Sequence, residues 1–136
     1  MSEENKKLVH HSIEQINRGD ISKFNEGIDS RFQDVFGDVA KRARAAFPDM
    51  RLKVEDQIAE GDKVVTRWSL AGTHTGDSKH SRLGAVKATG KKVHLTGITI
   101  HRIKDGKIVE SWGEVGKLEA LEQLGLVDNF AKVVHH

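Results

Sequence analysis

A few side chains near the end of this chain are of types that could carry chemistry. Segment 107–115 contains Glu114, and a carboxylate that is shielded from water can accept a proton near neutral pH. On an extended strand Glu114 shares one face with Trp112 and Gly116, with residues two apart separated by about 7 Å. In the alternative interpretation Glu114 is a rim or interface carboxylate that pairs with a lysine or an arginine.

Two histidines lie on segments with the same alternating pattern. His74 shares a face with Trp68 and Leu70, and His101 shares a face with Thr99. Either imidazole could donate a hydrogen bond to a ligand carbonyl, whereas a histidine at the end of a strand is more often satisfied by the backbone. The sequence thus predicts Glu114, His101 and His74 as catalytic candidates, and a pocket lined by Trp68, Leu70, Thr99, Trp112 and Gly116. Both tryptophans could equally be plain core.

Other classes of site receive little support. The histidines outside the first helix form no helical i, i+4 pair, and the chain has no cysteine, so we expect no metal. The glycines of 72–76 end a strand and lead into a loop rather than a helix, which argues against a nucleotide phosphate loop. We therefore expect no cofactor.

Composition and charge restrict the possible partners. The 136 residues suffice for a single domain spanning 1–136, and 22 basic against 20 acidic residues give a net charge of +2. The basic residues are scattered, and five Phe, two Trp and no Tyr offer few surfaces for stacking bases, so we expect no nucleic acid. No stretch is long and apolar enough to cross a bilayer, and with no cysteine we expect a cytoplasmic protein that does not bind membranes.

The first third of the chain has helical periodicity. An amphipathic helix is predicted over 3–18, and a short one over 21–26 between Asp20 as N-cap and Gly27. A third helix should begin at Asp29 or Ser30 and end before Pro48, because the residue before a proline avoids the helical region. Its predicted buried stripe consists of Phe32, Val35, Phe36, Val39, Ala43, Ala46 and Phe47.

After Asp49 the period changes to two. Segments 51–58 and 63–74 form a predicted hairpin, with Leu52, Val54 and Ile58 on one face. Segment 76–88 is predicted to be a long loop over the mouth of the pocket. Strands over 91–103 and 107–115 flank the turn Asp105-Gly106, and a last helix should bury Leu118, Leu121 and Leu124.

Helices followed by hairpins predict an α+β fold, in which the N-terminal helices pack on one face of a curved antiparallel sheet. Segment 91–103 is apolar on both sides, since Ile98 and Ile100 lie opposite the His101 face. One face should meet the helices and the other a second molecule. We therefore expect a homodimer that forms through the sheet.

The order of AAFPDM, VEDQIAEGDKVVTRWSLAGTHTG, TGKKVHLTGITIHRIKDGKIVESW and LEQLG resembles the SnoaL-like polyketide cyclase, or ester cyclase, family. That family belongs to the nuclear-transport-factor-2-like superfamily, which has a cone-shaped, cystatin-like roll. The resemblance covers the first helix and about residues 45–126. It implies a small apolar carbonyl or ester substrate and an aldol-type cyclisation or isomerisation, in which a carboxylate removes a proton alpha to a carbonyl.

Two departures from the family pattern bear on function. Members usually have a short strand between the second helix and FPD, whereas 31–46 here is one helical pattern. The catalytic aspartate, four residues after the tryptophan of the last strand, corresponds to Gly116. Glu114 is the candidate replacement. The alternative is a non-catalytic small-molecule-binding or dimeric scaffold with the same fold.

Overall fold

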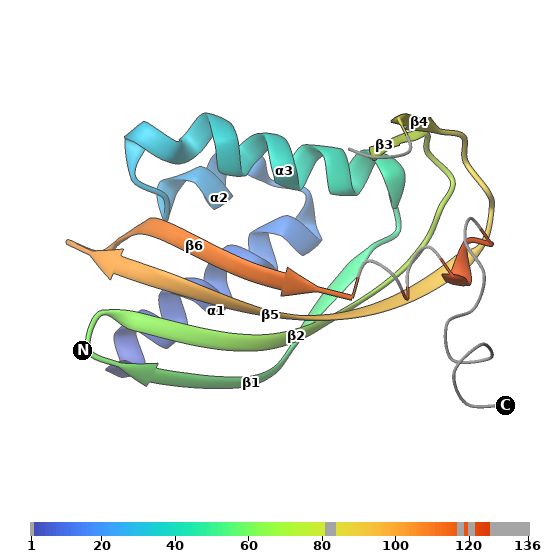
Figure 1. The fold of residues 1–136 in the computed structure, drawn as a ribbon. Helices are drawn as coiled ribbons and strands as arrows, with labels where there is room; N and C mark the ends of the chain where they lie inside the picture. The colour runs from blue at the N-terminus through green and yellow to red at the C-terminus, as the bar shows by residue number, and fades with distance from the viewer. Residues whose placement is uncertain (1, 81–83, 117–118, 120–121, 126–136) are drawn as a thin grey trace, which may run out of the picture.

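The protein, described by a computed structural model over residues 2–80, 84–116, 119 and 122–125, is built on a four-stranded antiparallel sheet (Figure 1). Its strands are β1 (Arg51–Glu60), β2 (Lys63–Thr73), β5 (Lys92–Lys104) and β6 (Lys107–Val115), in the order β1-β2-β5-β6. The helices of residues 2–46 cover one side of the sheet, which we call the inner face; the opposite side is the outer face. The predicted α+β architecture is confirmed.

The helices form where capping and periodicity predict them. They are α1 (Ser2–Arg18), α2 (Ile21–Glu26), the 3-10 turn η1 (Ser30–Phe32) and α3 (Gln33–Ala46). The Asp20 side chain accepts the backbone N–H of Lys23 at 3.0 Å and so caps α2. The core joins these helices to the inner face of the sheet through Val9, Ile13, Phe24, Ala40, Val64, Ile103 and Ile108.

The predicted buried stripe of α3 is wrong at two positions. Val35 and Val39 are 61% and 55% exposed, and Gly37 and Ala40 are buried instead, whereas Ala46 is buried as predicted. A Cβ added at Gly37 would lie 3.3 Å from the Asn25 side chain, so α3 crosses α2 on its small residues. The small residues Gly37 and Ala40 permit this close crossing, so the helix turns them toward the core and turns Val35 and Val39 to solvent.

A β-bulge in β1 corrects a second prediction. The register of β1 against β2 shifts between Val54 and Asp56, so Ile58 turns to the outer face and is 63% exposed. Gln57 takes the inner position instead, where its Nε2 donates to Thr66 Oγ1 at 3.2 Å and to the Lys6 carbonyl at 3.3 Å.

The segment predicted as a loop contains a small hairpin of β3 (Ser78–His80) and β4 (Gly84–Val86). Its base lies against the C-terminal end of α3, where the Gly76 N–H donates to the Ala46 carbonyl (Figure 1). The described part of this segment therefore does not cover the groove found at the other end of α3.

The turn between β5 and β6 has the predicted form, with Asp105 and Gly106 both at positive φ (52° and 73°). β6 is an edge strand, and among the described residues only its start is covered, by a parallel bridge between Ile28 and Ile108. Of the predicted last helix, Leu124 is buried, whereas Leu118 and Leu121 lie outside the described residues. None of the described helices is long and apolar enough to span a membrane.

Candidate functional site

The inner face of the sheet carries Trp68 and Thr99 side by side. The indole Nε1 of Trp68 donates to Thr99 Oγ1 at 2.9 Å. Its ring lies flat over Gly97, where an added Cβ would come within 2.3 Å of Trp68 Cζ2. Leu70, farther along β2, is buried. These three predicted pocket residues therefore share one face, as alternation along β2 and β5 requires.

His101 occupies the same face, directly opposite Val64 on β2 and Ser111 on β6. Its Nδ1 is buried and has no hydrogen-bond partner among the described residues. Burial lowers the pKa of His101 to about 4, because a charged imidazolium would lose its hydration there. The ring is therefore neutral near pH 7, with one nitrogen that donates and one that accepts.

His74 has a structural place. Its side chain is fully buried, and its Nδ1 accepts the Thr89 backbone N–H at 3.2 Å. Its backbone N–H donates to the Lys91 carbonyl, and its ring lies 5.4 Å from that of Phe47. His74 thus joins the two ends of segment 75–89, as the alternative interpretation of this histidine expected.

Glu114 and Trp112 lie on the outer face, which corrects the prediction that they share a pocket with Trp68. Glu114 pairs with Ile98, and Trp112 pairs with Ile100, both on the side away from the helices. Glu114 is exposed, and Trp112 is 47% exposed. Glu114 therefore points away from His101 and from the apolar inner face.

The end of β6 also differs from the expectation. The inner position there belongs to Val115, which pairs with Gly97 beneath Trp68. Gly116 follows the strand, and its N–H donates to the Thr96 carbonyl at 3.1 Å. A Cβ at Gly116 would lie 3.5 Å from Glu119 Oε2, so the carboxylate nearest to this position comes from Glu119.

A groove of about 470 Å³ lies between β6 and the start of the third helix. Phe32, Phe36, Val109 and Trp112 form its apolar walls, and Arg31, Arg102, Glu110 and Ser111 form its polar parts. The two phenylalanine rings stack with their centroids 6.1 Å apart. A volume of this size falls in the range of small-molecule sites, roughly 300–1,000 Å³.

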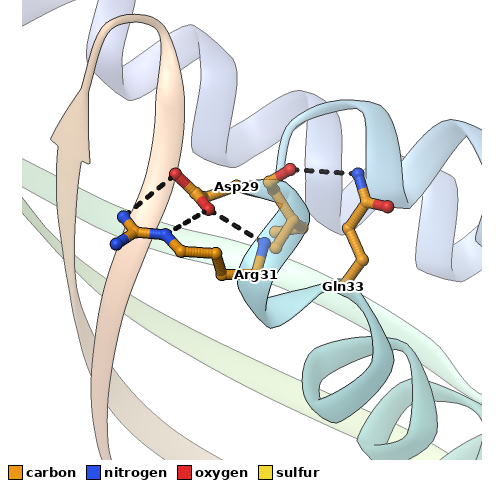
Figure 2. Close-up of polar contacts among 4 residues, drawn as sticks. Asp29, Arg31 and Gln33 are labelled. Carbon is orange, nitrogen blue, oxygen red and sulfur yellow. Dashed lines mark hydrogen bonds and ion pairs between the residues drawn. The ribbon is translucent and has the colours of Figure 1, made fainter.

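Ion pairs fix the rim of the groove. Arg31 Nε donates to Asp29 Oδ1 at 3.0 Å, and this contact holds the pKa of Asp29 below its usual value. Figure 2 shows this pair, with Gln33 donating to the Ile28 carbonyl beside it at 3.2 Å. Across the groove, Arg102 Nε donates to Glu110 Oε1.

Sequence reasoning missed Ser111, Phe32 and Phe36 as site residues. Alternation along β6 predicts that Ser111 faces outward. It faces inward because Val109 is an extra residue where the register shifts between Arg102 and Ile103. The phenylalanines were assigned to the core stripe of the helix. Among the residues that the structure describes, no cluster of three or more His, Cys, Asp or Glu could hold a metal.

The architecture places the chain in a class of proteins. Helices on one face of a curved antiparallel sheet, with a few polar groups among apolar ones, define the cone-like α+β fold of the nuclear-transport-factor-2-like superfamily. The chain belongs to the SnoaL-like polyketide cyclase family, which it matches over residues 7–124.

Solved structures support this assignment. The chain is 26% identical to AclR of Streptomyces galilaeus, described as a candidate hydroxylase, with a TM-score of 0.82 over 98% of this chain and 88% of that one. It is 28% identical to IdmH of Streptomyces antibioticus, a candidate polyketide cyclase, with a TM-score of 0.72 over 89% and 98%. TsrD of Streptomyces laurentii, at 24% identity, shares the fold with a TM-score of 0.82 over 91% and 96%. A search among curated proteins gives no significant match.

Proposed function

We propose that this protein binds a small, largely apolar molecule with a carbonyl or ester group, and that His101 donates a hydrogen bond to the ligand oxygen. The observation that carries the proposal is the buried His101 Nδ1, which has no partner among the described residues. Folded proteins pair nearly all buried polar atoms, so this exception points to a missing partner. Membership of a cyclase family supports the same class of ligand.

Binding without proton abstraction fits the geometry better than the aldol-type reaction. That reaction needs a carboxylate base beside the substrate, and Glu114 is exposed on the opposite face. Among the described residues, the strand positions facing inward around His101 carry no carboxylate. A histidine with a pKa of about 4 is itself a weak base near neutral pH.

A cyclase remains the second candidate, because family membership and the likeness to IdmH favour it. The base would then have to approach from beyond β6. Glu119 is the candidate, since its Oε2 lies 3.5 Å from where a Cβ at Gly116 would be.

One experiment separates the two candidates. Acetophenone and ethyl benzoate are titrated into the wild type, His101→Phe and Glu114→Gln, with heteronuclear NMR reporting binding. Exchange of the acetophenone methyl protons in D₂O reports carbon-acid catalysis in the same samples. We expect binding that His101→Phe weakens at least tenfold, no effect of Glu114→Gln, and exchange at the buffer rate. If the methyl protons exchange faster than in buffer alone, and a further variant, Glu119→Gln, abolishes this excess, the cyclase replaces the binding proposal.

We also propose that the outer face forms the homodimer, centred on β1, β2 and β5, so that the groove side of Trp112 on β6 stays open. Ile58, Val65, Ile100 and Trp112 make one apolar row across all four strands, because they are direct partners in the register. Ile98, 49% exposed, extends this outer row toward Arg67 and Glu114. Apolar groups gathered in this way on an exposed sheet face are typical of an interface.

A further inference from the structure

The groove beside β6 begins one strand away from His101. His101 and Ser111 are cross-strand partners on the inner face, and such partners have Cβ atoms about 5 Å apart. Ser111 also lines the groove, next to Val109. A ligand whose oxygen meets His101 therefore has the groove within reach of its next few atoms.

The groove passes over the free edge of the sheet. Ser111 faces inward and Trp112 faces outward, yet both line it. This is possible because β6 is an edge strand and, within the described part of the chain, it is covered only as far as the bridge between Ile28 and Ile108. Among these residues the groove is open sideways, between Phe36 and Trp112.

The charges on the rim are already neutralised. Arg31 is paired with Asp29, and Arg102 is paired with Glu110 and lies 3.9 Å from Asp62. An anionic ligand would therefore meet no arginine on this rim that lacks a carboxylate partner. A neutral, apolar ligand fits without such a loss.

We propose that the groove holds the apolar body of the same ligand, so that the protein selects neutral, elongated aryl or alkyl ketones and esters. This inference rests on the proposed function, because it places the carbonyl end at His101. The other end then crosses the edge of β6, past the stacked Phe32 and Phe36, and reaches Trp112. Length along this path, rather than charge, sets affinity.

A homologous series tests the proposal. Acetophenone and its para-methyl to para-butyl homologues are titrated into the wild type, Trp112→Ala and Ile98→Ala by NMR. Each added methylene that becomes buried should raise affinity about fourfold in the wild type. Trp112→Ala should lose this gain for the longer homologues. Ile98→Ala is the matched control, because Ile98 is equally exposed on the same face but lies outside the groove.

The outcomes distinguish the two proposals. The long homologues should also shift the indole signal of Trp112, whereas acetophenone alone should leave it unchanged. If ketones bind through His101 but the length dependence is the same in Trp112→Ala as in Ile98→Ala, the groove proposal is wrong and the proposed function stands. If no ketone binds, or His101→Phe binds as well as the wild type, both are wrong.

Discussion

The burial of His101, the proposed ligand-binding side chain, should make the free energy of unfolding depend on pH. Its pKa is about 4 in the folded protein and 6.5 in the unfolded chain, so the unfolded state takes up the proton first as pH falls. The stability that depends on neutral His101 is complete above about pH 6.5 and is lost progressively toward pH 4, up to about 3 kcal/mol.

His101→Phe should remove this pH dependence. It should also stabilise the protein near neutral pH by about 1 kcal/mol, because it eliminates a buried nitrogen that has no partner in the described part of the chain. Urea unfolding of both proteins across this pH range gives the difference directly. Identical pH profiles would show that His101 is not held neutral by burial.

Gly97 is required by the ring of Trp68. In Gly97→Ala the new methyl would overlap the indole, so we expect a loss of about 2–3 kcal/mol and a displaced Trp68 Nε1–H signal. Gly113→Ala is the control, because its Cβ would find the nearest atom, Thr99 Oγ1, at an ordinary 3.5 Å. Its stability should change by less than about 0.5 kcal/mol. Equal losses in the two variants would contradict the close packing of Trp68 on Gly97.

At the scale of elements, one side chain joins α1 to the sheet. Asn17 Nδ2 donates to the Leu52 carbonyl at 2.8 Å, and Asn17 Oδ1 accepts the Leu52 N–H at 2.7 Å. Asn17→Asp keeps the acceptor, loses the donor and places a charge beside a carbonyl. We expect a loss of about 2 kcal/mol in thermal or urea unfolding. Asn5→Asp makes the same change on the same helix, where the described residues show no side-chain hydrogen bond to Asn5, and it should have little effect.

The buried face of α3 can be tested in the same way. Val39→Glu places a charge where the side chain is already exposed and should leave the melting temperature nearly unchanged. Ala40→Glu, one residue on, buries a charge in the core and should cost more than about 3 kcal/mol. A larger loss of stability in Val39→Glu than in Ala40→Glu would show that Val39 is buried, as periodicity predicted.

What the sequence could predict depends on where alternation is interrupted. β2 and β5 pair without a shift, so the shared face of Trp68, Thr99 and His101 follows from counting by twos. In β6, strict alternation starting from the buried Ile108 would place Glu110, Trp112 and Glu114 on the inner face. The extra residue Val109 reverses that phase, so Glu114 turns outward. No pattern in the sequence marks such a bulge, and the groove could not be predicted because it depends on that reversal.

At the scale of the whole molecule, the outer face is the proposed homodimer interface. The apolar row from Ile58 to Trp112 runs between two rows that carry most of the charge of this face, Asp56, Arg67 and Glu114 on one side and Glu60, Lys63, Arg102 and Glu110 on the other. Such a row is too narrow to drive nonspecific aggregation, yet it offers a continuous apolar contact for a second sheet.

Ile98→Asp should therefore convert a dimer into a monomer. The carboxylate would lose its hydration against the partner sheet, and its two cross-strand neighbours, Arg67 and Glu114, carry opposite charges and leave it without net compensation. An uncompensated charge in an interface weakens it by two orders of magnitude or more, roughly 3 kcal/mol. Light scattering after size exclusion, across a dilution series, measures the effect. Val35→Asp is the matched control, because Val35 is even more exposed but lies on α3, away from the outer face. A wild type that stays monomeric at high concentration would contradict the dimer. A dimer that Ile98→Asp leaves intact while Val35→Asp dissociates it would place the interface on the helices instead of the sheet.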